Sequence, residues 1–215
     1  KRGWREIGAT REVAVLEIHQ ADNLTWLQEQ PGEQFDLIYV DPPFNTGKTQ
    51  ERSRLRTVAD AKGSRVGYAG KRYRTERLSA DAYADQFDDF HSFIGPRLEQ
   101  LHRLLKADGS LFVHLDYREV HYVKVMLDQI FGRPSFINEI IWAYDYGGRS
   151  KSRWSPKHDT ILFYAKDPKA YHFDFEAMDR IPYMAPGLVT PEKAARGKTP
   201  TDTWWHTIVA PASKE

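Results

Sequence analysis

The sequence contains no cysteine, which excludes disulfide bonds, thiolate metal sites and every reaction that needs a cysteine nucleophile. It also lacks any apolar run near the roughly 20 residues that a membrane-spanning helix requires. Its first residues are basic and polar, with no apolar signal region. From these absences we expect a soluble, cytoplasmic protein that does not contact a membrane.

Neither sign of charge is in excess overall, because 31 Lys and Arg residues oppose 30 Asp and Glu residues among 215. The balance conceals a local asymmetry. Residues 48–77 hold ten basic and three acidic residues, whereas the rest of the chain holds 21 basic and 27 acidic. A basic segment on an otherwise acidic protein indicates contact with a polyanion at one place. The alternative is a solvated surface loop.

The sequence offers little for a metal site, although it contains eight histidines. The close His and Asp pairs at expected strand ends are His19 with Asp22 and His114 with Asp116. Neither pair has a third ligand at a recognisable spacing. We therefore expect no metal.

Hydrophobic periodicity predicts an α/β fold with a doubly wound sheet, since strands and helices alternate through residue 131. The run 35–40 is almost continuously apolar, which is typical of a strand buried on both faces. Residues 168–215 lose this alternation, and we interpret them as an irregular appendage. The expected strands are 13–19, 35–40, 110–115, 136–142 and 159–164, and the expected helices are 23–28, 80–106 and 118–131.

The turn Asp41-Pro42-Pro43-Phe44 directly follows the most apolar predicted strand. Open α/β sheets bind ligands at the carboxyl ends of their strands, and the prolines stiffen this turn. The turn offers a carboxylate, a proline carbonyl that pairs with no neighbouring strand, and an aromatic ring. This combination suits a nucleobase, whose amino group can donate to the two oxygens while its ring stacks on Phe44. The alternative is a rigid turn with a capping Asp and a core Phe.

The segment Asp-Leu-Ile-Tyr-Val-Asp-Pro-Pro-Phe-Asn-Thr-Gly at 36–47 resembles the catalytic motif of the amino-group DNA methyltransferases. The resemblance is closest to the β-type order, in which this motif comes early. It covers about residues 13–166 and continues at 21–24, 104–114, 138–142 and 157–164.

The resemblance implies a Rossmann-like methyltransferase sheet and methyl transfer from S-adenosylmethionine to adenine N6 of a flipped base. Cytosine N4 is the alternative target. A protein-glutamine methyltransferase usually has Asn at the position of Asp41, which counts against that reading. The expected catalytic residues are Asp41, Pro42, Pro43 and Phe44, and the expected cofactor-binding residues are Asp22, Asn23, Asp41 and Asn45. For Asp22 and Asn23, helix capping is the alternative role.

The same resemblance divides the chain into a catalytic portion, 1–167, and a target-recognition region, 168–215. We expect 48–77 to be a mobile loop that closes over double-stranded DNA. A second copy of the chain and a cognate restriction endonuclease are further candidate partners. The expected DNA-contacting residues are Arg52, Arg54, Arg56, Arg72, Arg74, Lys157 and Trp204. For Trp204 and Trp205, packing in a small core is the alternative.

One family feature is missing, the Phe-x-Gly-x-Gly turn that approaches the cofactor. Gly147-Gly148 lies in a predicted loop and does not replace it. From this we expect an incomplete methyltransferase sheet, truncated before the cofactor half and inactive by itself as 215 residues. A non-catalytic DNA-binding remnant is the alternative from another class of protein.

Overall fold

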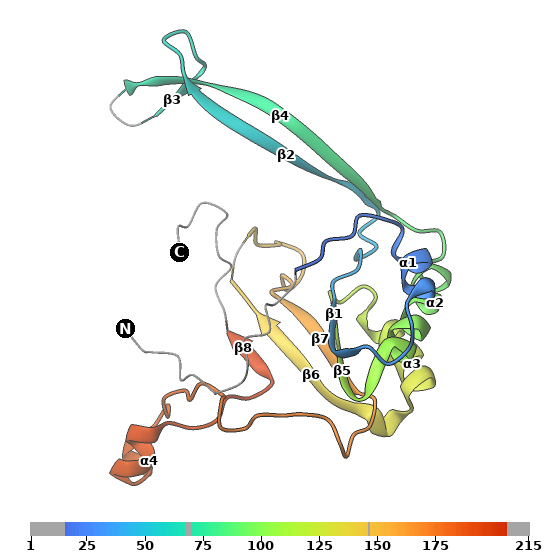
Figure 1. The fold of residues 1–215 in the computed structure, drawn as a ribbon. Coiled ribbons are helices and arrows are strands. Elements are labelled where there is room, and N and C mark those ends of the chain that lie inside the picture. Colours follow the sequence, from blue (N-terminus) through green and yellow to red (C-terminus); the bar gives the residue numbers. More distant parts are fainter. Residues whose placement is uncertain (1–15, 68–69, 146, 206–215) are drawn as a thin grey trace.

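The computed structural model of the protein describes residues 16–67, 70–145 and 147–205. The side chains of residues 51–55, 77–81, 83 and 84 lie outside this description. A five-stranded sheet carries helices on one face, and a long β-hairpin projects away from this body (Figure 1).

The main sheet is mixed and has the strand order β1-β5-β7-β6-β8. β1 and β5 are parallel, β7 runs antiparallel to both of its neighbours, and β8 is parallel to β6. The strands are β1 (Phe35–Val40), β5 (Leu105–Leu115), β6 (Phe136–Ala143), β7 (His158–Ala165) and β8 (Thr203–Trp205).

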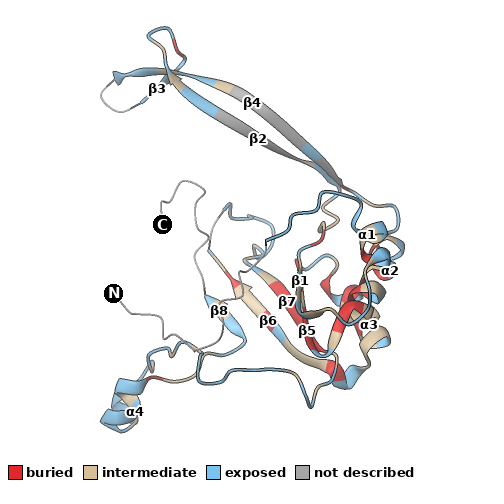
Figure 2. Cartoon of the chain, in the orientation of Figure 1, coloured by how far each residue is buried: buried red, intermediate tan, exposed pale blue. Residues whose placement is uncertain are grey.

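Three helices pack against one face of this sheet, which confirms the expected α/β class (Figures 1 and 2). They are α1 (Asn23–Glu29), α2 (Phe90–Leu104) and α3 (Val120–Phe131). The opposite face carries a smaller cluster, against which Tyr171 and Trp204 of the irregular segment pack. Among the described residues the helices therefore cover one face, and the sheet is not wound on both. The helix-side core includes Leu98, Leu111, Val113, Val123, Leu127, Leu162 and Tyr164.

Local sequence signals account for the helix ends. Asp22 caps α1, because its Oδ1 accepts a hydrogen bond from the Leu24 amide at 2.9 Å. Asp89 caps α2 in the same way through the Ser92 amide. α3 ends at Gly132, whose φ of 83° lies in the region that favours glycine.

The first strand prediction is not supported by the described part of the segment 13–19. Residues 16–20 form no strand, and the Leu16 and Ile18 residues are each 86% exposed. Residues 13–15 lie outside the described residues. A β-branched, apolar pattern forms a strand only where a neighbour supplies hydrogen bonds, and none pairs with 16–20.

β1 forms where the sequence predicted it, but the expectation that both of its faces are buried is wrong. Leu37 is 58% exposed and Tyr39 is 51% exposed. β1 lies at an edge of the sheet, and the helices cover only the face that carries Ile38 and Val40.

The basic segment is a β-hairpin, which corrects the prediction of a loop at 48–77 and of a helix beginning at residue 80. β2 (Lys48–Ala59) pairs antiparallel with β4 (Arg72–Asp85), and β3 (Arg65–Val66) adds a short third strand. The ladder pairs the backbone groups of strands whose sequence is mostly polar, so hydrophobic periodicity does not reveal it. α2 begins only at Phe90 and continues through Pro96.

The segment after β7 contains little regular structure. Besides the short helices η3 (Pro186–Leu188) and α4 (Pro191–Arg196), it supplies β8, which pairs with β6. A further short helix, η2 (Arg133–Ser135), connects α3 to β6. No helix within the described ranges is long and apolar enough to cross a membrane.

Leu98→Ala should lower the free energy of unfolding by about 2–5 kcal/mol, because Leu98 is fully buried between α2 and the sheet. Leu188→Ala is the matched control. Leu188 is 87% exposed, so its truncation should change stability by less than about 0.5 kcal/mol. Urea denaturation of both variants measures the difference, and equal midpoints would contradict the assigned core.

Candidate active site

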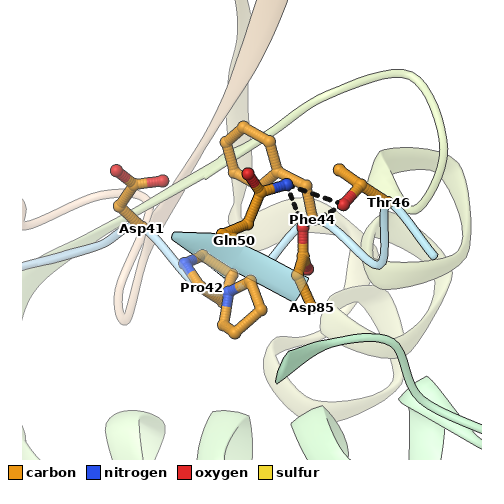
Figure 3. Close-up of a pocket in the computed structure, with 7 residues that line it drawn as sticks. Asp41, Pro42, Phe44, Thr46, Gln50 and Asp85 are labelled. Atoms are coloured by element: carbon orange, nitrogen blue, oxygen red, sulfur yellow. Dashed lines mark hydrogen bonds between the residues drawn. The ribbon is translucent and has the colours of Figure 1, made fainter. Parts of the chain in front are cut away.

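The Asp41–Phe44 turn lies at the edge of the sheet where the parallel strands β1 and β5 both end. β7 runs in the opposite direction, so its first residues lie at this same edge. The turn lines a pocket of about 550 Å³ (Figure 3). The residues that line it are Asp41, Pro42, Pro43, Phe44, Thr46, Gln50 and Asp85.

Asp85, the last residue of β4, holds the chain that follows the turn. Its carboxylate is buried and accepts hydrogen bonds from the Asn45 amide at 2.8 Å and the Thr46 hydroxyl at 2.5 Å. Its backbone oxygen accepts from the Gly47 amide at 2.9 Å. The base of the hairpin is therefore fastened to the residues immediately after Phe44.

Gln50 of β2 brings an amide group into the pocket wall. Its Nε2 donates to Thr46 Oγ1 at 2.9 Å and to Asp85 Oδ2 at 3.3 Å. Because the Asp85 carboxylate can only accept, these bonds orient the Gln50 nitrogen toward it. Figure 3 shows the amide oxygen on the other side, toward Asp41. This oxygen is an acceptor that the pocket offers to a ligand.

Asp41 is the exposed carboxylate of the turn, with a side chain that is 59% exposed. Partial burial raises its pKa; His114 acts to lower the pKa and Asp159 to raise it, and the net change is upward. His114 Nδ1 lies 3.9 Å from Asp41 Oδ1. The Phe44 ring, half-buried in the pocket, packs 5.7 Å from the His114 ring between centroids.

The expected cofactor-binding residues are not brought together. Asp22 caps α1, which is the alternative role expected for it. Asn23 is the first residue of this helix, and its Oδ1 accepts from Arg97 Nε at 2.8 Å. Asn45 has a φ of 52°, and its side chain bonds Glu119 at 2.7 Å and the Phe87 amide at 3.1 Å. Asp41 is the one member of the set that lines the pocket.

The expected DNA-contacting arginines lie on the hairpin. Arg56, Arg72 and Arg74 are exposed. Arg56 pairs across the strands with Glu76, and Arg74 with Val58, so these side chains share a face with Arg72. Arg74 is also bonded to Glu76 at 2.6 Å. Arg52 and Arg54 belong to β2, but their side chains lie outside the described residues.

Trp204 and Trp205 have separate environments. Trp204 packs against the cluster of Ile140, Ile161 and Phe163, whereas Trp205 is 76% exposed. Trp205 therefore carries the exposed ring, whereas Trp204 packs as the alternative for this pair described; contact of Trp204 with DNA stays a prediction. Lys157 Nζ donates to the Gly148 carbonyl at 3.1 Å.

Among the residues that the structure describes, no group of three or more His, Asp and Glu side chains could hold a metal ion. His114 and Asp116 do not form the pair that the sequence spacing suggested. His114 faces Tyr39 and Asp159, while Asp116 bonds Arg118.

Sequence reasoning missed four residues around the turn, namely Gln50, Asp85, His114 and Asp159. The first two lie on strands that the pattern did not predict. The last two come from β5 and β7, which meet the turn only in the folded sheet. A usable signal was the position of His114 and Asp159 at the ends of predicted strands.

Comparison with known proteins identifies the class that this fold and pocket represent. The family model N6_N4_Mtase, described as DNA methylase, matches residues 35–215. The chain belongs to this family of DNA methylases.

Individual relatives are more distant. The type II methyltransferase M.KpnI of Klebsiella pneumoniae is 29% identical over 157 residues, which are 71% of this chain and 33% of that protein. The DNA adenine methyltransferase YhdJ of Escherichia coli K12 is 25% identical over 162 residues, 75% of this chain and 45% of that protein. The chain thus spans less than half of either relative.

One solved structure is that of the PvuII DNA methyltransferase, described as cytosine-N4-specific. It aligns with a TM-score of 0.46 and 15% identity, over 91% of this chain and 57% of that one.

Asp85→Asn should loosen the residues that follow the turn. The Asn45 amide and the Thr46 hydroxyl each donate to one carboxylate oxygen, and in the variant one of these donors would face an NH₂ group, which cannot accept. A hydrogen bond to a charged acceptor contributes about 1.5–3 kcal/mol, so protection of the Asn45 amide should fall by about tenfold or more. Hydrogen–deuterium exchange measures it. Asp60→Asn is the control, since Asp60 lies at the far end of the hairpin and caps the Lys62 amide. Unchanged protection at Asn45 in Asp85→Asn would refute the fastening role.

Proposed function

We propose that the chain is the base-binding portion of an S-adenosylmethionine-dependent DNA methyltransferase that methylates adenine N6. The observation that carries this proposal is the Asp41-Pro-Pro-Phe turn at the carboxyl end of β1, which lines a pocket open to solvent. Membership of the DNA methylase family supports the reaction class.

Three of the pocket residues have a proposed role in holding the base. The Asp41 carboxylate accepts a hydrogen bond from the exocyclic amine, and the Pro42 carbonyl accepts the other. These bonds orient the nitrogen lone pair out of the ring plane, toward the incoming methyl group. The Phe44 ring stacks on the base, a contact that contributes about 1–3 kcal/mol.

S-adenosylmethionine, when bound, supplies an electrophilic methyl group for direct displacement by the amine. No enzyme nucleophile is needed, in keeping with the absence of cysteine. The target base must leave the duplex to reach the pocket, which costs a few kcal/mol of unstacking.

Adenine is proposed as the target because Asp at the position of Asp41 is the more usual residue in adenine enzymes of the family that the motif resembles. YhdJ, one of the relatives, is described as a DNA adenine methyltransferase. Cytosine N4 is the second candidate, since the same acceptors would hold its amino group.

Several relatives are described as type II methyltransferases or as subunits of type III restriction–modification enzymes. A cognate restriction endonuclease is therefore the partner we propose.

Asp41→Ala in the full-length gene product should lower kcat by about 100-fold or more, because a group that handles the amine directly is removed. Affinity for DNA should stay within about twofold, since phosphate contacts supply most of it. Asp36→Ala is the control. Asp36 is an exposed carboxylate of β1, the strand that precedes the turn. It pairs with Lys106 at 2.7 Å and does not line the pocket.

Mass spectrometry of nucleosides from the methylated DNA identifies the base. We expect N6-methyladenine. N4-methylcytosine would select the second candidate, and an Asp41→Ala variant with more than a tenth of the wild-type rate would contradict the role of Asp41.

The hairpin is the proposed DNA-binding arm. It projects away from the body (Figure 1), and it carries the exposed face of Arg56, Arg72 and Arg74. Its base is bonded to the turn through Asp85. A duplex held along the arm would therefore lie near the pocket into which the base is flipped.

We also propose that the irregular segment 168–205, with the exposed Trp205, contributes to target recognition.

Replacing Arg56, Arg72 and Arg74 by Ser should flatten the slope of log affinity against log salt by about 2–3 units. Each phosphate contact contributes roughly −0.9 to that slope. Because Arg74 is already paired with Glu76, its replacement should contribute less to the change in slope than the other two. The control replaces Lys106, Lys124 and Arg133, which lie on β5, α3 and η2, outside both the hairpin and the segment 168–205, and thus removes the same charge. Equal slopes in both triple variants would show that the arm does not contact phosphates.

A further inference from the structure

A buried imidazole lies between two carboxylates behind the candidate active site. The His114 side chain is 9% exposed, with Nδ1 3.9 Å from Asp41 Oδ1 and Nε2 3.5 Å from Asp159 Oδ2. The contact with Asp159 has ion-pair distance but not hydrogen-bond geometry, and Nε2 is buried without a hydrogen-bond partner. The Tyr39 hydroxyl bonds Nδ1 at 2.9 Å.

The groups around this imidazole come from three strands. Tyr39 and Asp41 approach from β1 and the turn, and Asp159 approaches from β7. From β6 the neighbour is the uncharged Trp142 ring, 5.4 Å away between centroids. Asp159 is itself bonded to the Tyr144 hydroxyl at 3.2 Å. These described groups surround His114 with acceptors and aromatic rings.

We propose that His114 is a positioning residue for Asp41: it keeps that carboxylate ionised and directed at the amino group of the flipped base. The proposal rests on the methyltransferase function proposed above. An ionised carboxylate can accept from the amine with either oxygen, whereas a protonated one would present a competing O–H donor.

The balance of charges at Asp41 gives the proposal its measurable consequence. Partial burial and Asp159 act to raise the Asp41 pKa, and His114 acts to lower it. Without His114 only the raising influences remain, and Asp41 should take up its proton at a higher pH.

The first test needs no activity. Carbon-13 NMR titration of the carboxyl groups, with Asp41→Asn to assign the resonance, should show the Asp41 midpoint moving up by about 0.5–1 pH unit in His114→Gln. Tyr39→Phe removes the hydroxyl that bonds His114 Nδ1. Because Tyr39 is an exposed residue, this variant tests the same idea without altering a buried side chain. Its shift should have the same direction and be smaller. His102→Gln is the control, because His102 is a partly buried histidine that packs on Phe131, away from the pocket.

The second test uses the full-length gene product. The acid limb of kcat should move to higher pH in His114→Gln by the same amount as the NMR midpoint, with DNA affinity unchanged. A wild-type protein that methylates no DNA would refute the proposed function, while the NMR shift would still test the link between His114 and Asp41. An Asp41 midpoint that is unchanged in both His114→Gln and Tyr39→Phe would overturn the inference. A lower kcat without any change in its pH profile would also overturn it, since that result would mean a merely structural role.

Discussion

The parallel pairing of β1 with β5 is the constraint on which the candidate site depends. Its register places Val40 opposite Val113, so the turn that begins at Asp41 starts beside His114. β7 then pairs antiparallel with β5, and Leu115 lies opposite Thr160, which brings Asp159 to the same edge. A one-residue slip in either ladder would turn these side chains to the other face of the sheet. The geometry of the carboxylates is therefore a property of strand register.

A second constraint joins the arm to this edge. The hairpin begins and ends close to the turn, and the buried Asp85 bonds the residues that follow Phe44. Gln50, from the other hairpin strand, shares the same network and lines the pocket. The base of the hairpin and the residues that follow the turn thus share one hydrogen-bond network. Leu37 and Tyr39, on the face of β1 that the helices do not cover, are exposed.

Local sequence patterns predicted the elements whose cause is local. The apolar run at 35–40, the Asp22 cap and the helix expected at 118–131 each correspond to the observed structure, because propensity and capping depend on near neighbours. The hairpin was not predicted, since its polar strands are stabilised by pairing across more than thirty residues at the base, as between Lys48 and Asp85. The same pairing took Tyr83 into β4, although its spacing suggested the first turn of a helix.

The sequence by itself determined the chemistry of the turn. Two adjacent prolines restrict the backbone between a carboxylate and an aromatic ring wherever the segment lies, and the absence of cysteine excludes a cysteine nucleophile. Tertiary structure alone decided what surrounds that turn. His114, Asp159, Gln50 and Asp85 come from four strands far apart in the chain, and only hydrogen-bonded register brings them to one edge. Their roles follow from distances and burial, which local propensity does not encode.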